Sequence, residues 1–159
     1  MNQEFHFTYQ KLENADQLSS VEKDLLETAR AITSNAYAPY SNFNVSAVAK
    51  MENGEIIKGT NQENASYPVG ICAERVLLST ISSLSPNTAI DILAISYNNI
   101  NGKSDHPISP CGMCRQALVE YEGRTKPMKV IMSGQNGEVI VLDSAKRLLP
   151  FSFSVDDMK

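Results

Sequence analysis

The stretch "SPCGMCRQ", residues 109–116, holds two of the chain's three cysteines, Cys111 and Cys114. They open the segment "CGMCRQALVEYE", residues 111–122, which is predicted to be a helix with both cysteines in its first turn. Residues three positions apart share one face of a helix, so the two thiols reach the same point. The unpaired N–H groups and the dipole at a helix N-terminus also favour thiolate over thiol.

The third cysteine, Cys72, begins another predicted helix, "CAERVLLSTISSL", residues 72–84. If the two helix N-termini meet at the end of a sheet, the three thiolates lie together. Three protein ligands on a zinc ion leave the fourth position open to water, which is the pattern of a catalytic rather than a structural site. Glu74 follows Cys72 closely, and a carboxylate beside such a water can take its proton and later deliver it.

Charged neighbours of the cysteines suggest how the site is tuned. Three thiolates around Zn²⁺ leave a net negative charge, which opposes ionisation of the water. Arg75 lies three positions after Cys72 and Arg115 directly follows Cys114, so either could offset this charge through N–H···S contacts. His6 and His106 are not expected to be ligands, because neither has a C-x-E or C-x-x-C neighbour.

The remaining segments alternate between predicted strands and helices. Ser19 and Glu22 form a capping box at the start of one helix. Two Asn-Gly pairs, at Asn53 and Asn136, mark hairpin turns. The predicted elements are a strand at residues 5–12, a helix at 19–38, a hairpin at 44–60, a strand at 89–98, a hairpin at 128–143 and a short helix at 144–150.

This order predicts an α/β fold, with helices on both faces of a central mixed β-sheet in three α/β/α layers. The two helix-linked crossovers predict parallel neighbours, and the hairpins predict antiparallel ones. The length of 159 residues favours one domain, residues 1–159.

Composition narrows the class of protein. The net charge is −4 and there is no block of lysine and arginine, which argues against nucleic acid as the main partner. No apolar run reaches the roughly 20 residues that span a membrane, and the N-terminus lacks a signal-peptide pattern. We therefore expect a cytoplasmic protein without a membrane partner. An odd number of cysteines in that compartment indicates buried, catalytic or metal-bound thiols rather than disulfides.

Four blocks of the sequence resemble the short-chain cytidine deaminases that use three cysteines. They are "YAPYSNFNVSA", "GTNQENASYPVGICAER", "SPCGMCRQ" and "LLPFSF", and they run from about Tyr37 to Phe153. A zinc site with a nearby glutamate that is not a ligand, and a P-C-x-x-C element, is the known arrangement of zinc deaminases. The resemblance implies zinc-dependent hydrolytic deamination of cytidine and 2′-deoxycytidine, in pyrimidine salvage.

The same resemblance implies a role for each site residue. Cys72, Cys111 and Cys114 would bind one zinc ion per subunit, and Glu74 would be the proton shuttle. The substrate contacts that it implies are Asn61 and Glu63 to the ribose hydroxyls, Phe43 near the pyrimidine, the backbone of Ala65 to the base, and Phe153 reaching into the site of a neighbouring subunit in a homotetramer.

Two positions depart from the family pattern. Asn44 and Ser46 stand where the family has proline and glycine after Phe43, so an altered strand beside the base is expected. The first twenty residues exceed the shortest family members, and we expect them to extend the sheet or a subunit contact.

Other functions remain open at this point. The site could serve another small aminopyrimidine nucleoside or a nucleoside antibiotic, although the Asn61 and Glu63 pair favours a ribose. An editor of cytosine in RNA or DNA is disfavoured by the acidic charge balance. A structural zinc module would not need Glu74. A redox pair of Cys111 and Cys114 would form a reversible disulfide.

Overall fold

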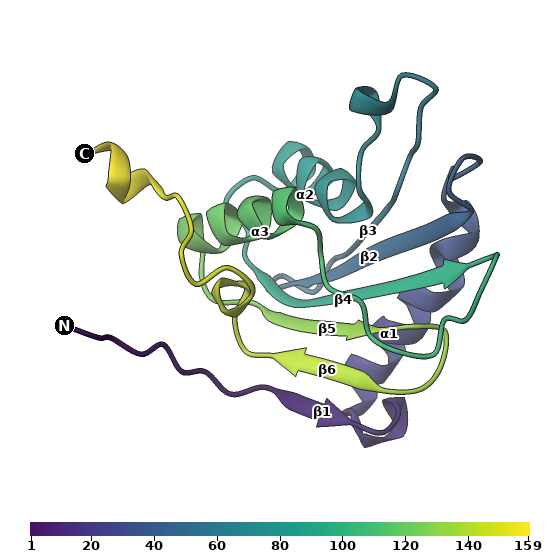
Figure 1. The fold of residues 1–159 in the computed structure, drawn as a ribbon, viewed down its shortest axis with the longest axis horizontal. Coiled ribbons are helices and arrows are strands. Elements are labelled where there is room, and N and C mark those ends of the chain that lie inside the picture. Colours follow the sequence, from purple (N-terminus) through teal and green to yellow (C-terminus); the bar gives the residue numbers. More distant parts are fainter.

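The computed structural model describes residues 1–159 and contains a six-stranded sheet in the order β1-β6-β5-β4-β2-β3 (Figure 1). The strands are β1 (Gln10–Leu12), β2 (Phe43–Met51), β3 (Ile56–Thr60), β4 (Ile90–Asn99), β5 (Lys129–Ser133) and β6 (Val139–Leu142). The helices are α1 (Ser20–Ile32), α2 (Ala73–Leu84) and α3 (Gly112–Arg124). Short 3-10 turns occupy Ala15–Gln17, Thr33–Asn35, Tyr67–Val69, Ala145–Leu148 and Val155–Met158.

Helices cover both faces of this sheet, so the predicted three-layer α/β/α fold is confirmed (Figure 1). One core cluster joins α2 and α3 to the sheet through residues such as Leu77, Leu118 and Ile95. The other lies under α1 and includes Leu26, Ala29 and Val48. None of the helices combines the length and the hydropathy that a membrane-spanning helix requires.

Only one of the two crossovers joins parallel neighbours. β4 and β5, linked by α3, pair in parallel as predicted. β3 and β4 run in the same direction but do not pair, because β2 lies between them and is antiparallel to both. The reason is burial: β2 has fully buried alanines and needs a strand on each side, whereas β3 alternates exposed and buried residues and suits the edge.

Local sequence chemistry explains most element boundaries. Ser19 caps α1 in the predicted box, accepting from the backbone N–H of Glu22 while the Glu22 carboxylate accepts from the backbone N–H of Ser19. The helix ends at Ile32 rather than near residue 38, because the hydroxyl of Thr33 donates to the carbonyl of Arg30 at 2.8 Å. Both predicted hairpin turns place a glycine at positive φ, Gly54 at 89° and Gly137 at 77°. The predicted last helix is a single 3-10 turn, Ala145–Leu148, capped by Ser144.

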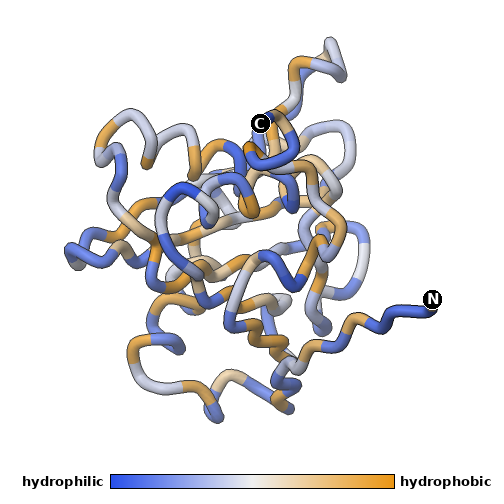
Figure 2. Tube along the Cα trace, turned by 90° about the vertical axis from the view of Figure 1, so that its left-hand side faces the viewer, coloured by the Kyte–Doolittle hydropathy of each residue, from blue (hydrophilic) through white to orange (hydrophobic).

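The N-terminal strand is shorter than predicted. Only Gln10–Leu12 pair with β6, which is itself four residues long and ends at Leu142, one residue beyond the partner of Gln10. Phe5, Phe7 and Tyr9 precede the paired part and are exposed, with neighbouring rings in contact. Figure 2 shows this segment leaving the body of the protein with alternating hydropathy.

Two close approaches fix the layer that carries α2 and α3. A side chain at Gly59 of β3 would come within 2.6 Å of the carbonyl oxygen of Ala73, so α2 starts directly against the sheet. At the far end of α3, the buried carboxylate of Glu122 accepts from the backbone N–H groups of Met128 at 3.0 Å and Ala145 at 2.7 Å, and from the hydroxyl of Ser144. Glu122 thereby ties α3 to the start of β5 and to the last 3-10 turn.

We expect Glu122→Ala to lower the free energy of unfolding by about 2–4 kcal/mol, because it leaves two buried backbone N–H groups without an acceptor. Glu120→Ala, on the exposed side of the same helix, is the matched control and should change stability by less than about 0.5 kcal/mol. Urea unfolding followed by circular dichroism measures both. Equal effects of the two substitutions would contradict the assigned role of Glu122.

Candidate active site

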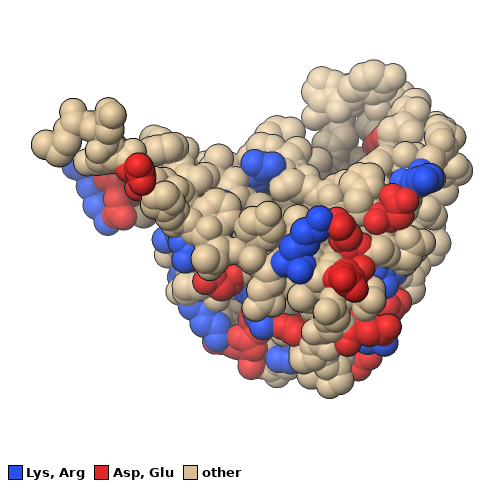
Figure 3. Space-filling model, turned by 60° about the horizontal axis from the view of Figure 1, so that its bottom comes forward, with Lys and Arg blue, Asp and Glu red and all other residues tan.

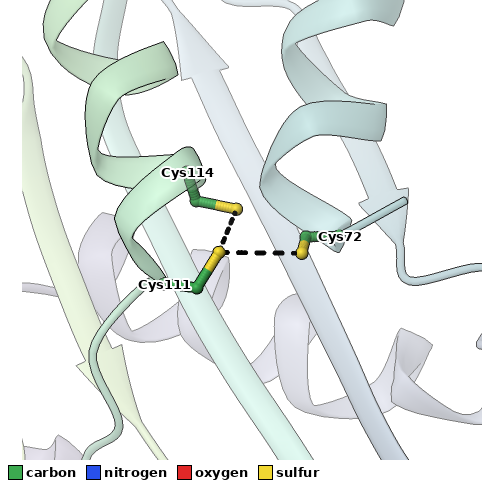
Figure 4. A group of neighbouring side chains, drawn as sticks. All are labelled: Cys72, Cys111 and Cys114. Atoms are coloured by element: carbon green, nitrogen blue, oxygen red, sulfur yellow. Dashed lines mark hydrogen bonds between the residues drawn. The ribbon is translucent and has the colours of Figure 1, made fainter. Parts of the chain in front are cut away.

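The three cysteines meet where two helices begin. Cys72 is the N-cap residue of α2, Cys111 is the N-cap residue of α3, and Cys114 lies in the first turn of α3. Figure 4 shows the three side chains pointing toward one another from the two helices. Their sulfur atoms are 3.9 Å apart between Cys72 and Cys111 and 3.5 Å apart between Cys111 and Cys114, and all three lie within 4.8 Å of one another.

This spacing fits a zinc ion. Zinc–thiolate bonds of about 2.3 Å in a tetrahedron place sulfur atoms about 3.8 Å apart, close to the 3.9 Å and 3.5 Å found for two of the three pairs here. Three soft sulfur ligands also suit zinc better than hard cations such as magnesium. The donor set and its geometry therefore both match a site with three protein ligands and one open position.

Burial and hydrogen bonding shift the pKa values of the three thiols in different directions. Burial raises the pKa of Cys72, and it raises the pKa of Cys114 further still. Burial also acts on Cys111, but its hydrogen bonds with the backbone N–H of Cys114 and with the two neighbouring thiols outweigh it and lower the pKa of Cys111. A cation would be required to hold all three as thiolates in this place.

Glu74 lies in the first turn of α2 with only 4% of its surface exposed. Burial raises the pKa of this carboxyl, against its own backbone N–H and the thiol of Cys114, which lower it. Glu74 lines the same cavity as Cys72 and Cys111. A buried carboxyl beside the thiol cluster is suited to exchange protons with a group held at the open position.

The cavity has a volume of about 340 Å³, which is enough for a small organic ligand. Cys72, Cys111 and Glu74 line one part of it, and three other segments form its walls. These walls include Phe43 and Val45 of β2, Asn61 after β3, and Ile108 and Ser109 of the loop before α3. The predicted residue Phe43 therefore lies at the cavity.

Asn61 also lies at the cavity, but both polar atoms of its side chain are already engaged. Its Oδ1 accepts from the backbone N–H of Val45 at 2.7 Å, and its Nδ2 donates to the carbonyl of Phe43 at 3.0 Å. The amide therefore clamps the first residues of β2. The sequence predicts only a substrate contact for Asn61, because the partners in this structural contact are 16 and 18 positions away along the chain.

Glu63 holds the segment just before β2. Its carboxylate accepts from the backbone N–H groups of Tyr40 at 2.9 Å and Ser41 at 3.3 Å, and from the hydroxyl of Ser41 at 2.5 Å. These hydrogen bonds outweigh desolvation and lower the pKa of Glu63. Glu63 lines a second cavity of about 400 Å³ with Tyr40 and Tyr67, and Ser41 borders both cavities. Sequence reasoning missed Ser41, although its place in the "YAPYSNF" block could have indicated it.

Three other predicted residues lie outside the cavity of this chain. Ala65 is exposed in the loop after β3, and Phe153 is exposed near the C-terminus, where its carbonyl accepts from the side chain of Gln116 at 2.8 Å. Arg75 is half-buried on α2 and forms no side-chain hydrogen bond or ion pair. Arg115 donates instead to the carbonyls of Pro110 at 2.8 Å and Leu148 at 3.2 Å.

The two departures in β2 do not face the cavity. Side chains alternate along a strand, so Phe43 and Val45 point toward α2 and α3 while Asn44 and Ser46 point toward α1. Ser46 is fully buried there, and its hydroxyl donates to the carbonyl of Ala29 at 2.6 Å. The expected disturbance beside the base is therefore wrong for Ser46, whose hydroxyl is satisfied on the opposite face of the sheet.

Three converging thiols and a buried carboxyl at an open cavity define the class of metal-dependent hydrolytic enzymes. Residues 19–139 match the family described as the cytidine and deoxycytidylate deaminase zinc-binding region. The chain belongs to this family, which confirms the predicted fold family, enzyme class and zinc cofactor.

Individual proteins similar to this chain are cytidine deaminases. A cytidine deaminase of Halalkalibacterium halodurans is 34% identical over 134 residues, covering 84% of this chain and 95% of the relative. A cytidine deaminase of Mycobacterium tuberculosis is 30% identical over 136 residues, covering 82% and 87%. The crystal structure of cytidine deaminase from Burkholderia pseudomallei has a TM-score of 0.72 and 35% identity, covering 86% of this chain and all (100%) of that one.

We expect Asn61→Asp to destabilise the protein by about 1–3 kcal/mol, because a carboxylate cannot donate to the carbonyl of Phe43. Asn64→Asp is the matched control. The side chain of Asn64 only accepts, from the backbone N–H of Ser66 at 2.8 Å, and a carboxylate can replace it there. Thermal unfolding of the two variants compares them. A stable Asn61→Asp variant would show that the clamp on β2 is dispensable.

Proposed function

We propose that the protein deaminates cytidine and 2′-deoxycytidine to uridine and 2′-deoxyuridine, releasing ammonia. The observation that carries this proposal is the cluster of Cys72, Cys111 and Cys114, of which Cys72 and Cys111 line one cavity together with the buried Glu74. Membership in the deaminase family supports the reaction class, and the cytidine deaminases among its relatives support the nucleoside.

In this proposal the three cysteines bind one zinc ion, which supplies Lewis acidity that makes water nucleophilic near neutral pH. Glu74 takes a proton from the attacking water as the water oxygen bonds to C4 of cytosine. Glu74 delivers that proton to N3, and the second water proton leaves with the amine as the C4–N4 bond breaks. Burial of Glu74 keeps its proton affinity high enough for this shuttle.

The walls of the cavity would orient the nucleoside. Phe43 offers an aromatic face to the base, and Asn61 and Glu63 carry the polar groups assigned to the ribose. Each has to share or exchange a hydrogen bond that it now makes to the segment from Tyr40 to Val45. The acidic side chains of Glu63 and Glu74 favour a neutral nucleoside over a nucleotide, whose phosphate they would repel. Arg75 is proposed to offset the negative charge of the thiolates once the metal is bound.

We also propose that residues 1–159 act as one deaminase domain within a cytoplasmic homotetramer that serves pyrimidine salvage. Exposed aromatic side chains support an assembly, since monomers rarely leave many of them uncovered. Tyr40 and Tyr67 form one exposed pair with ring centroids 5.8 Å apart, and Phe151 and Phe153 are 94% and 61% exposed. Phe153, and the backbone of Ala65, would then reach the site of a neighbouring subunit.

Nucleic acid is not the proposed substrate. On the face in Figure 3, lysine and arginine side chains are interspersed with aspartate and glutamate rather than gathered in a basic groove. Several are paired, as with Lys126, which contacts Glu52 at 3.2 Å and Asp91 at 3.0 Å. Such a surface lacks the clustered cations on which phosphate-backbone binding depends.

The test of the proposed function is the ultraviolet spectrum of cytidine mixed with zinc-loaded protein. We expect conversion to the uridine spectrum in the wild type and a loss of at least about 100-fold in kcat for Glu74→Ala, with zinc retained. Deoxycytidylate, single-stranded oligonucleotides and other aminopyrimidine nucleosides form the comparison panel. Undiminished turnover in Glu74→Ala would refute the proton shuttle, and turnover confined to another member of the panel would replace cytidine as substrate.

The metal ligands have a separate test. We expect Cys114→Ser to purify with far less zinc than the wild type, because it removes a fully buried thiolate ligand. Met113→Ser changes the exposed neighbour on the same helical turn and should keep about one zinc per chain. Elemental analysis of the purified proteins measures both. Full zinc content in Cys114→Ser would remove this cysteine from the ligand set.

A further inference from the structure

A buried tyrosine lies directly behind the aromatic wall of the cavity. Tyr97 of β4 is 1% exposed and does not line the cavity, yet it contacts Phe43, which does. We propose that Tyr97 is a positioning residue that holds the ring of Phe43 in place for the substrate. The effect on catalysis rests on the proposed function, whereas the effect on the ring of Phe43 does not.

The sheet register brings the two rings together. Tyr97 pairs with Val45 across β2 and β4, and Phe43 precedes Val45 by two positions on the same face. The ring centroids of Phe43 and Tyr97 are 5.0 Å apart with an angle of 11° between the planes. This is a stacked pair at the edge of the cavity, and its alignment limits the positions open to the Phe43 ring.

The loop before α3 holds Tyr97 from the other side. The ring of His106 meets that of Tyr97 edge-on, with centroids 5.9 Å apart, and Nδ1 of His106 lies 3.3 Å from the phenol oxygen. Burial raises the pKa of Tyr97, so the phenol stays neutral near neutral pH. The side chain of His106 therefore packs against Tyr97 on the side away from Phe43.

The backbone just before His106 is itself fixed by the β5–β6 hairpin. A side chain at Gly134 would come within 2.1 Å of the carbonyl oxygen of Ser104, and one at Gly137 within 2.1 Å of the carbonyl oxygen of Asp105. The hairpin therefore packs against this loop backbone to backbone. The same loop continues into the cavity wall and Cys111, so Tyr97 lies between the loop that carries a thiol and the ring of Phe43.

A residue that acts only through the placement of Phe43 should change substrate binding more than the chemical step. The hydroxyl of Tyr97 is partnered by His106 and its ring by Phe43, and Tyr97 does not line the cavity in which Glu74 carries the proposed proton transfers. Removing its ring leaves space behind Phe43, and the aromatic face then turns away from the substrate position in part of the population. The expected signature is a higher KM with kcat and zinc content nearly unchanged.

The experiment compares Tyr97→Leu, Tyr97→Phe and Tyr121→Leu. Tyr97→Leu should raise KM for cytidine about three- to tenfold, while Tyr97→Phe keeps the stacked ring and should restore a KM near that of the wild type. Tyr121 is a second buried tyrosine, 3% exposed, that lies on α3 and donates to the carbonyl of Thr88. Its replacement controls for the loss of a buried ring elsewhere, and KM should not change.

A second readout needs no substrate. The protein labelled with 4-fluorophenylalanine has five fluorine resonances at most, one for each phenylalanine, and Phe43→Leu assigns that of Phe43. Tyr97→Leu should shift or broaden the Phe43 resonance, and Tyr121→Leu should not. An unchanged Phe43 resonance in Tyr97→Leu would overturn the proposal, whether or not cytidine is the substrate. A shifted resonance with unchanged KM would overturn the catalytic role of the positioning, and absence of turnover in the wild type would count against the proposed function alone.

Discussion

The meeting of two helix N-termini on one face of the sheet is the constraint on which the site depends. α2 starts with Cys72 and α3 with Cys111, so both helices must begin at the same depth for the thiols to meet at 3.9 Å. Gly59 allows the first turn of α2 to lie directly on β3, because any side chain there would overlap the backbone of Ala73. The parallel pairing of β4 and β5 fixes α3, since the helix must cross between them on that face. The metal centre is thus a product of how the layers pack.

That packing places three thiols and the Glu74 carboxyl close together, where their negative charges would repel one another without a cation. Burial raises the pKa of Cys72, Cys114 and Glu74, because it disfavours the charged form of each group. Zinc reverses this preference for the thiols, because it binds thiolates and compensates their charge. Since a preformed site of this kind does not exist in the unfolded chain, zinc binding also stabilises the fold. The same residues therefore contribute to folding and to the proposed chemistry.

Sequence patterns predicted the parts of this arrangement that depend on local spacing. Helix starts at Cys72 and Cys111, the capping box at Ser19 and the glycine turns follow from residues within a few positions of one another. Such patterns do not predict the order of strands that lie far apart in the sequence. The position of β2 between β3 and β4 depends on burial across the whole sheet. The clamp by Asn61 and the stack of Tyr97 on Phe43 also join residues many positions apart, so no short motif indicates them.

The structure also separates the roles of adjacent residues within one motif. In "YAPYSNFNVSA", Phe43 and Val45 face the cavity, whereas Asn44 and Ser46 face α1, because a strand alternates its side chains. A substitution at Ser46 therefore tests the contact with Ala29 and the α1 layer rather than the substrate wall. By the same alternation, Tyr97 shares the cavity-side face with Phe43, and Ser96 lies with Ser46 on the other. A residue of this strand can therefore contact the substrate only if its side chain points toward α2 and α3.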